Sequence, residues 1–514
     1  MKAPAPSLPF EASVEPGVWR YDHADKLTVL VDAEEYFLQI QSAMLKAEQE
    51  ILLLGWDFDT RIHLARGRRW YQRPFNRGYP SRLGSFLLWL PRKRKGLDIK
   101  LLVWGYSFLQ FLTRGSMGLD MLRMAAKRQI QFKHDTQLPF GCSHHQKIAV
   151  LDRSLAVCGG IDLTRERWDS RKHHKVDPRR RTIWGSAYQP WHDMSVMMQG
   201  DIAGALFDLT QERWERAGGE PLKQVEEARG HCWPDDLEVH FKDVEVGISR
   251  SRPAHDDAEA IDEVEALFLR HIKQAQRFIY IENQYLTSRS IVEAMVSRLQ
   301  EDDPPEIIMV HPREAEGWLE QQAMDHTRSS LVKTLRAADH KKRFHLYVAY
   351  TGDLAIYVHS KLMIVDDQIL RVGSANLNNR SMGLDSECDV FIDTARPANN
   401  GHTDAVTRLR HALLAEHCGL DEDDAAKLFG AAESISQVIE EHGMAGDRRL
   451  ERFEIPDEAE MSEFLADSQI LDPEVPEEMF AAYPKGGLYR PGSVLYRARE
   501  KLRRGQRSNK GRDA

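Results

Sequence analysis

The sequence is poor in cysteine and contains no long apolar run. Its five cysteines never form a CxxC pair. They are scattered at Cys142, Cys158, Cys232, Cys388 and Cys418. An odd and scattered set argues against a disulfide framework and against a zinc ribbon. The longest apolar-leaning stretches, such as residues 99–112, are too short and too interrupted to span a bilayer.

A recognisable leader and an excess of positive charge are also missing. The N-terminal segment has no basic region followed by an apolar core, which a signal peptide would have. With 70 Lys and Arg against 79 Asp and Glu, the formal net charge is −9. Because nucleic-acid binding depends on a concentrated basic surface, nucleic acid is not the expected partner. The net charge is still compatible with a local basic groove. We expect a cytoplasmic protein, with peripheral membrane binding left open.

What the sequence does contain is one short pattern that occurs twice. Each copy has a histidine, a lysine and an aspartate at the same spacing, and a glycine follows each lysine at the same distance. The first copy is His145, Lys147, Asp152 and Gly159, and the second is His359, Lys361, Asp366 and Gly373. Packing alone does not explain a doubled set of these residue types. The repeat therefore predicts one active site built from two similar halves.

The histidines and lysines of the two copies suit phosphoryl transfer. On a strand, alternate residues share a face, so His145 projects with Lys147, and His359 projects with Lys361. A neutral histidine can attack phosphorus, and a protonated one can give a proton to the leaving oxygen. Lysines can stabilise the charge that develops on the phosphoryl oxygens. Since the lysines supply the positive charge, we expect this chemistry to need no metal and no cofactor.

Polar residues downstream of each motif could bind the phosphate or orient the histidines. In the second copy they are Ser374, Asn376 and Glu387, and the corresponding residues of the first copy are Gly160, Asp162 and Asp193. Hydroxyl and amide groups could bind phosphate oxygens, and a carboxylate such as Glu387 could hold the His359 ring in one tautomer. We interpret Asp193 as the counterpart of Glu387. An ionised Asp162 would repel phosphate, so it is interpreted as orienting a neighbour.

Two interpretations of the motif aspartates stay open. Asp152 and Asp366 belong to the candidate catalytic set, but they follow the ends of the expected strands. A structural task, such as accepting hydrogen bonds from the backbone or an arginine, explains that position at least as well. The remaining histidines of these regions are interpreted as surface or supporting residues, namely His144, His173, His174 and His192.

The repeat extends to the elements expected around the motifs. Buried strands are expected in matching pairs, at 51–58 and 278–285, 99–104 and 306–310, 130–134 and 344–348, and 147–151 and 361–365. Helical patterns lie at 33–49, 119–128, 262–276 and 323–338. Strands that alternate with helices predict an α/β fold. We expect two similar α/β/α sandwich halves with mixed, largely parallel sheets, related by a pseudo-twofold axis, with the active site at their interface.

The expected boundaries follow from the repeat and from composition. The first half spans 20–220 and the second 240–420, so that one chain carries both half-sites and a monomer suffices. Residues 421–514 form a C-terminal extension that is acidic at first and ends in a basic tail, which is predicted to be disordered. Two basic runs, at 65–98 and 165–181, are interpreted as loops or insertions near the first motif.

These residues resemble the phospholipase D superfamily, whose signature is HxKxxxxD followed by GG or GS. The resemblance covers most of residues 45–420 and includes ENQY at 282–285, PWHD at 190–193 and AEH at 415–417. It implies a metal-independent phosphodiesterase or transphosphatidylase that works through a phosphohistidine. In most such enzymes the first histidine is the nucleophile and the second the acid, which would assign these roles to His145 and His359. The sequence leaves that order open.

The resemblance implies that the substrate is a phospholipid at a membrane surface. Cleavage of its distal phosphodiester would release a head-group alcohol and phosphatidic acid, with water or another alcohol as acceptor. A cardiolipin synthase-like phosphatidyltransferase is an alternative, although such synthases usually carry N-terminal membrane helices. A nuclease is disfavoured by the net charge. A non-catalytic membrane-binding scaffold is disfavoured because both histidines and both lysines are present.

Overall fold

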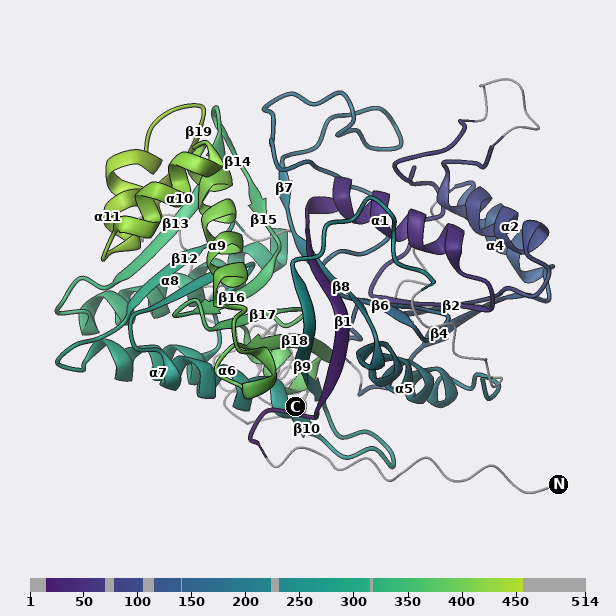
Figure 1. The fold of residues 1–514 in the computed structure, drawn as a ribbon, viewed down its shortest axis with the longest axis horizontal. Coiled ribbons are helices and arrows are strands. Elements are labelled where there is room, and N and C mark those ends of the chain that lie inside the picture. The colour runs from purple at the N-terminus through teal and green to yellow at the C-terminus, as the bar shows by residue number, and fades with distance from the viewer. Residues whose placement is uncertain are drawn as a thin grey trace, which may run out of the picture.

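One mixed β-sheet runs through both halves of the chain, with helices on either side of it (Figure 1). The computed structural model describes residues 15–69, 78–104, 115–139, 141–222, 231–314 and 318–455. Part of the basic run at 65–98 and the whole of the expected basic tail lie outside these residues.

The first half begins with a long strand and ends with a helix. Its strands are β1 (Arg20–Val31), β2 (Glu50–Gly55), β3 (Asp98–Trp104), β4 (Ile130–Asp135), β5 (Ile148–Leu151), β6 (Leu155–Gly159), β7 (Trp191–His192) and β8 (Met194–Gln199). Its helices are α1 (Asp32–Lys46), α2 (Leu83–Lys93), α4 (Met117–Ala125) and α5 (Asp201–Arg216).

The second half repeats this order. Its strands are β9 (Phe241–Arg252), β10 (Ile261–Asp262), β11 (Phe278–Asn283), β12 (Glu306–Val310), β13 (Phe344–Thr351), β14 (Leu354–Ala355), β15 (Tyr357–Val358), β16 (Lys361–Val365), β17 (Ile369–Gly373), β18 (Glu387–Asp393) and β19 (Arg448–Arg452). Its helical segments are α6 (Glu263–Gln274), α7 (Arg289–Leu299), α8 (Trp318–Ala338), η1 (Arg380–Leu384), η2 (Pro397–Asn399), α9 (Thr403–Cys418), α10 (Glu422–Ala431), α11 (Ile435–Val438) and η3 (Ile439–Gly443). The four expected strand pairs are confirmed as β2 and β11, β3 and β12, β4 and β13, and β5 and β16.

The strand order shows how the two halves are related. Hydrogen bonds join the strands in the order β4-β3-β2-β5-β6-β8-β1-β9-β18-β17-β16-β11-β12-β13-β19. The antiparallel pair β1–β9 lies at the centre, and the order on one side of it repeats the order on the other. Two similar halves related by a pseudo-twofold axis are therefore confirmed.

Two details of the expected fold are corrected. The halves share one continuous sheet instead of having separate sheets, because β1 and β9 pair with each other. Parallel pairing does not dominate either. In the described part of this sheet it joins β2-β3-β4 and β11-β12-β13, while the other neighbours are antiparallel. Each motif strand continues through a short turn into the next strand, and such a connection produces an antiparallel pair.

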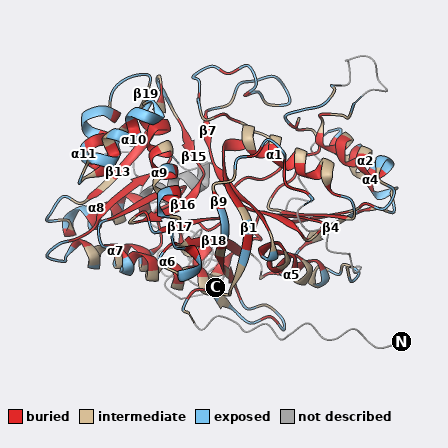
Figure 2. Cartoon of the chain, viewed as in Figure 1, coloured by how far each residue is buried: buried red, intermediate tan, exposed pale blue. Residues whose placement is uncertain are grey.

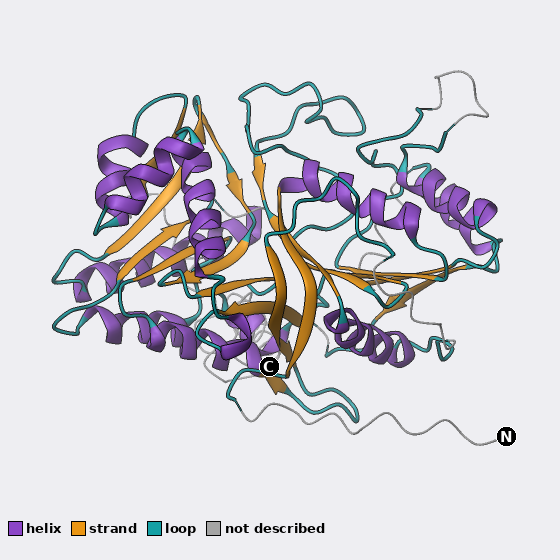
Figure 3. Ribbon diagram, in the orientation of Figure 1, coloured by secondary structure: helices purple, strands orange, loops and turns teal. Residues whose placement is uncertain are grey.

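The inner strands are buried on both faces, which explains their continuous apolar sequences. All residues of β11 are buried, as are all residues of β5 (Figure 2). Helices α1 and α2 cover one face of the first half, and α5 covers the other (Figure 3). In the second half, α6 and α7 lie on one face and α9 on the other. The core beneath α5 and α9 is continuous between the halves.

The C-terminal extension is partly integrated into the second half. Strand β19 pairs with β13 in antiparallel register and ends the order of strands in the second half, and α10 packs against α9. The sheet of the second half therefore continues past residue 420. No helix in the described part of the chain combines the length and the apolar character needed to cross a bilayer.

Candidate active site

Each motif histidine is held by a segment from the opposite half. The backbone N–H of His359 donates to the carbonyl of His192 at 2.7 Å, where β15 and β7 pair in parallel. The backbone N–H of His145 donates to the carbonyl of Ser386 at 2.9 Å, beside a parallel bridge between His144 and Ser386. These two contacts are equivalent under the pseudo-twofold axis. They bring both motifs to the junction of the halves, as the repeat predicts.

The same segments carry the carboxylates that orient the rings. Nδ1 of His145 lies 3.1 Å from Oε2 of Glu387, and Nδ1 of His359 lies 2.7 Å from Oδ2 of Asp193. Asp193 and Glu387 are therefore counterparts, as expected. The expectation that Glu387 orients His359 is wrong, because each carboxylate crosses the interface and holds the histidine of the other half.

The contacts of His145 also determine its tautomer. Nδ1 lies 3.0 Å from the carbonyl oxygen of Ser374, which can only accept a hydrogen bond. Nδ1 must therefore carry a proton, and in the neutral ring Nε2 keeps its lone pair. The Asp193 carboxylate favours the same tautomer of His359. Both rings can then present a basic nitrogen to a shared substrate.

Both motif lysines are buried and anchored at a backbone carbonyl. Nζ of Lys147 donates to the carbonyl of His145 at 2.8 Å and lies 3.4 Å from Oδ2 of Asp162. Nζ of Lys361 donates to the carbonyl of His359 and to Oε1 of Gln284 at 3.2 Å. These contacts hold each ammonium group beside the ring of its own motif.

The electrostatics indicate that the two copies surround one space. Burial, and then Lys147 and Lys361, lower the pKa of His145 well below the ordinary value of histidine. Burial, Lys361, Arg167 and Lys147 lower the pKa of His359 in the same way. Each histidine therefore senses the lysine of the other motif. Both rings are neutral at pH 7, and the cations around them suit an anion such as a phosphodiester.

Ser374 and Asn376 have different surroundings. The hydroxyl of Ser374 donates to Oε2 of Glu387, so it supports the orienting carboxylate. Ser381 donates to the other oxygen of Glu387 at 2.7 Å. The side-chain oxygen of Asn376 is buried and has no hydrogen-bond partner within the described residues. Of the two residues expected to bind phosphate, Ser374 is engaged by Glu387, and the free atom of Asn376 is an acceptor, which does not donate to a phosphate oxygen.

The corresponding residues of the first half explain the asymmetry of the repeat. A Cβ atom on Gly160 would lie 2.1 Å from Oδ1 of Asp193, so glycine leaves the space that this carboxylate occupies. Asp162 accepts a hydrogen bond from the backbone of Trp56 at 3.1 Å and faces Lys147. Gly160 thus makes room for an orienting group, and Asp162 positions a lysine, as its expected role as an orienting residue implies.

The two motif aspartates hold the backbone. Asp152 accepts hydrogen bonds from the amides of residues 48–50 at 2.7–2.8 Å, at the start of β2. Asp366 accepts from the amides of residues 276–278 at 2.7–2.8 Å, at the start of β11. Of the two roles left open by the sequence, these contacts support the structural one.

Asp152→Asn is expected to lower the free energy of unfolding by about 1–3 kcal/mol, because an acceptor oxygen that serves buried amides becomes a donor. Asp366→Asn should lower the free energy of unfolding by a smaller amount, since the amides that contact Asp366 are more exposed. Urea unfolding followed by circular dichroism measures both effects. The folded fraction of each variant should retain its turnover number. A loss of turnover at unchanged stability would return these aspartates to the catalytic set.

Comparison with known proteins now identifies the family. The family model for phospholipase D matches residues 43–303, and that for the cardiolipin synthase, PLD-like domain, matches residues 268–405. The chain belongs to the phospholipase D superfamily. Together the two matches span both motifs, so the superfamily assignment includes both half-sites.

Individual relatives of this superfamily are distant and longer. Phospholipase D A of Dictyostelium discoideum is 25% identical over 79% of this chain and 36% of that protein. Phospholipase D alpha 1 of Vigna unguiculata is 24% identical over 76% of this chain and 65% of that protein. The chain thus spans less than two thirds of either relative. Among solved structures, phosphatidylserine synthase of Haemophilus influenzae has the same fold, with a TM-score of 0.50, 12% identity, and coverage of 82% of this chain and 95% of that one.

Sequence reasoning missed several residues around this superfamily site. Arg167 lies 4.1 Å above the ring of Trp191, which is stacked on Tyr357 at 4.6 Å. Arg167 belongs to the basic run at 165–181, and charge alone did not distinguish it from a solvated loop. Its effect on the pKa of His359 places it among the cations of the site.

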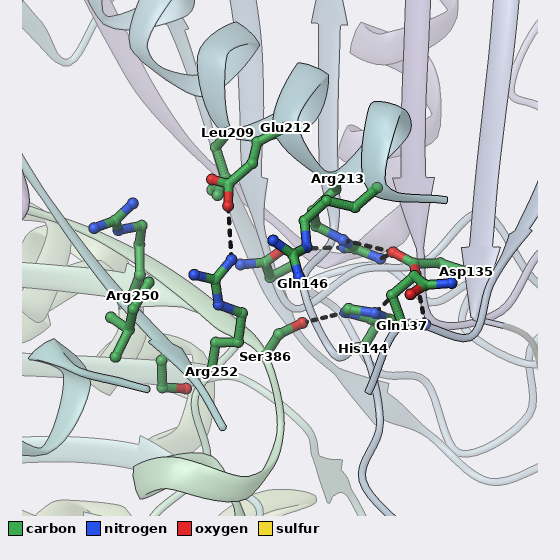
Figure 4. A pocket seen from close by; sticks show the side chains of 13 residues that line it. Asp135, Gln137, His144, Gln146, Leu209, Glu212, Arg213, Arg250, Arg252 and Ser386 are labelled. Carbon is green, nitrogen blue, oxygen red and sulfur yellow. Dashed lines mark hydrogen bonds and ion pairs between the residues drawn. The ribbon is translucent and has the colours of Figure 1, made fainter. Parts of the chain in front are cut away.

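His144 faces away from the phosphate site, as the alternation along a strand predicts. Its ring contacts the hydroxyl of Ser386 at 2.7 Å and Oδ1 of Asp135 at 3.0 Å (Figure 4). Arg213 donates to Asp135 and to Gln146, which precedes Lys147. These residues line a small pocket. His144 is therefore a buried supporting residue behind His145.

Proposed function

We propose that this protein is a phospholipase D-type phosphodiesterase and transphosphatidylase. It cleaves the distal phosphodiester of a phospholipid to phosphatidic acid and a head-group alcohol, through a phosphohistidine intermediate. The observation that carries the proposal is the pair of carboxylate-anchored imidazoles, His145 and His359, in one cationic site with two buried lysines. A neutral nucleophile, an acid and preorganised positive charge are the groups that this displacement needs.

The orienting carboxylates support different roles for the two histidines. Burial raises the pKa of Glu387 to about 8, so this carboxyl is mostly protonated at pH 7 and does little to favour an imidazolium. That environment suits His145 as the neutral nucleophile. Burial raises the pKa of Asp193 as well, against the opposing effect of Lys361. The difference between the two carboxylates therefore lies in the contact, since Asp193 approaches Nδ1 of His359 to 2.7 Å and Glu387 approaches Nδ1 of His145 to 3.1 Å. A closer carboxylate stabilises an imidazolium better when it is ionised, so His359 suits the acid that protonates the leaving head group.

Two steps complete the reaction. Nε2 of His145 attacks phosphorus, the P–O bond to the head group breaks, and His359 gives its proton to the departing oxygen. His359 then removes a proton from water or an alcohol, which attacks the phosphohistidine and restores His145. A phosphodiester anion between the rings adds negative charge, which favours the protonated state of His359 that the first step requires.

The acceptor decides between hydrolysis and synthesis. The matches to a cardiolipin synthase domain and to the fold of a phosphatidylserine synthase make a phosphatidyltransferase the second candidate. It would use the same two steps with a phosphatidyl alcohol as acceptor. In either case one chain supplies both half-sites, so we propose that a monomer acts at a membrane surface as a peripheral protein.

Parallel incubation with phosphatidylcholine, phosphatidylglycerol and single-stranded DNA tests the proposal. Phosphatidic acid with free choline supports hydrolysis, and cardiolipin with glycerol supports the transferase. Addition of ethanol should divert the phosphatidyl group to phosphatidylethanol at the expense of phosphatidic acid. Release of nucleotides without any lipid product would overturn both lipid proposals and favour the nuclease.

The value of kcat/KM is expected to fall as the pH rises through about 7. Burial and Lys147 lower the pKa of Lys361 to about 7 against the effect of Asp193, so the ammonium charge is present below this pH and lost above it. Lys361→Arg keeps a cation at every pH and should abolish the decline, at a lower overall rate. Profiles of kcat/KM between about pH 5 and 9 measure this.

The control for that profile is Glu387→Gln, which removes the carboxyl that contacts His145 and whose pKa burial raises to about 8. The value of kcat/KM for Glu387→Gln should still decline as the pH rises through about 7. If the decline disappeared in Glu387→Gln and persisted in Lys361→Arg, the titrating group would be Glu387 instead of Lys361.

A further inference from the structure

A second cluster of histidines and carboxylates lies behind the phosphate site. Its members are Asp32, His173, His192 and Glu416, whose side chains are at most 2% exposed. They come from the first residue of α1, the loop before β7, β7 itself and α9. The cluster therefore joins both halves of the chain at one buried point. The proposed phosphoryl chemistry uses none of these groups.

The spacing of the four side chains suits a metal ion. Nε2 of His173 lies 3.3 Å from Oδ2 of Asp32, and Nδ1 of His192 lies 3.2 Å from Oδ1 of Asp32. Oε1 of Glu416 lies 3.0 Å from both of these ring nitrogens. All four donor atoms lie within 4.8 Å of one another. A tetrahedral zinc ion with nitrogen and oxygen ligands at about 2.0–2.2 Å separates its ligand atoms by about 3.3–3.5 Å.

The other nitrogen of each ring is already engaged by a carboxylate. Nδ1 of His173 lies 3.0 Å from Asp169, and Nε2 of His192 lies 2.8 Å from Glu282. Asp169 is held in turn by Arg180 at 2.9 Å. Histidines that bind metals donate their outer N–H to a carboxylate in this way, which directs the lone pair of the other nitrogen at the metal. In the neutral rings, both inner nitrogens present lone pairs to the centre of the cluster.

Two of the inner atoms form no hydrogen bond with the residues that the structure describes. Nδ1 of His192 and Oδ2 of Asp32 are buried and lack a hydrogen-bond partner within the described residues. A ring lone pair at 3.0–3.2 Å from two carboxylate oxygens is repulsive unless a cation lies between them. Arg171 contacts the outer oxygen of Glu416 at 2.6 Å and leaves the inner one facing the rings. A cation is therefore needed at the centre, and it is either an ion or protons on the rings.

We propose that Asp32, His173, His192 and Glu416 bind one divalent first-row transition metal ion, with Zn²⁺ as the best match to four close nitrogen and oxygen ligands. Four protein ligands make a closed, structural site instead of a catalytic one. Oδ1 of Asp32 accepts a hydrogen bond from the backbone N–H of Asp193 at 3.1 Å, and the N–H of Asp32 donates to the carbonyl of Asp193 at 2.7 Å. The ion would thus clamp the halves together and position the carboxylate that orients the second motif histidine.

Untagged full-length protein tests the proposal by its metal content, which does not depend on turnover. Mass spectrometry should find about one equivalent of a transition metal per chain. Removal of the ion with a chelator in mild denaturant should lower Tm, and Zn²⁺ should restore it. Substitution with Co²⁺ should produce the visible absorption of tetrahedral coordination. Purified protein that is metal-free, binds neither Zn²⁺ nor Co²⁺ and shows no change in Tm would overturn the proposal.

Variants assign the ion to this cluster. The His173→Ala variant should lose the bound metal. The His174→Ala variant, which changes the exposed neighbour, should retain it. His145→Ala should retain the metal although it is expected to be inactive, which separates this proposal from the proposed function. If His173→Ala does not fold, the metal content of the wild-type protein decides. Retention of a full equivalent in folded His173→Ala would refute the assignment.

The competing occupant of the cluster is protons. In the absence of an ion, the carboxylates outweigh burial and raise the pKa of His173 to about 9. A doubly protonated pair of rings would then balance Asp32 and Glu416. This state predicts no metal in the purified protein and no gain of stability with Zn²⁺, so the measurements above distinguish the two occupants.

Discussion

Replacing His145 or His359 with alanine is expected to lower turnover of a phospholipid by about 10⁴-fold or more, because each ring acts in both steps of the proposed reaction. Without His145 no phosphohistidine can form. Without His359 neither the leaving group nor the acceptor exchanges a proton with the enzyme. The rings act as one unit, so the double variant should be no less active than either single variant. Release of head group from a labelled phospholipid measures these rates.

The exposed His174 provides the matched control. His174→Ala should keep wild-type turnover, and circular dichroism should show that all variants are folded. Substrate labelled in the phosphate should transfer label to the wild-type protein and to His359→Ala but not to His145→Ala. Label on His145→Ala and none on His359→Ala would reverse the order of the two histidines. Appreciable turnover by either single variant would contradict a composite site.

The second large effect is expected at Asp193, which orients His359. Asp193→Asn should lower turnover of a phospholipid by about 10³-fold or more, because an amide no longer stabilises the protonated ring and can favour the wrong tautomer. The leaving group of an aryl phosphodiester needs no proton. Asp193→Asn should therefore slow the first turnover of this substrate far less than it slows turnover of a phospholipid. Stopped-flow release of the aryl alcohol measures that first step. The rate losses of Asp193→Asn with the two substrates are then compared. A larger loss with the phospholipid indicates a missing acid, whereas equal losses indicate a disturbed structure.

Glu387→Gln serves as the counterpart across the pseudo-twofold axis. Because burial raises the pKa of Glu387 to about 8, this carboxyl is already mostly neutral at pH 7. Its replacement by glutamine should therefore lower turnover of a phospholipid by about tenfold or less. The loss should also be similar for both substrates, since Glu387 supports the nucleophile. If Glu387→Gln showed the strong dependence on leaving group and Asp193→Asn did not, His145 would be the acid.

Much of the fold was predictable because it depends on local patterns that occur twice. Apolar runs such as Ile51–Leu54 and Phe278–Ile281 are buried strands, and the period of the intervening segments marks helices. The doubled His-Lys-Asp pattern predicted one site at the junction of two halves. The contacts of His145 and His359 at that junction agree with it. These inferences needed only spacing and residue type.

The continuous sheet was not predictable, because it depends on contacts between distant segments. Pairing of β1 with β9 joins residues 20–27 to residues 241–248, and no local pattern specifies that partner. Short turns after the motif strands account for the antiparallel pairs β5–β6 and β16–β17. The other antiparallel pairs of the sheet join strands that longer segments separate, so the sequence pattern does not reveal them.

By itself, the sequence determined which groups are the candidates for the chemistry, since the doubled motif contains two histidines and two lysines. Only the tertiary structure decided which carboxylate serves which ring. Docking of the halves places Glu387 on His145 and Asp193 on His359. It also collects His192 and His173, which comes from a basic, polar run in the sequence, into a buried cluster with Asp32 and Glu416. The physical reason is the same in both cases: a hydrogen bond between residues far apart in the chain exists only after the sheet has brought them together.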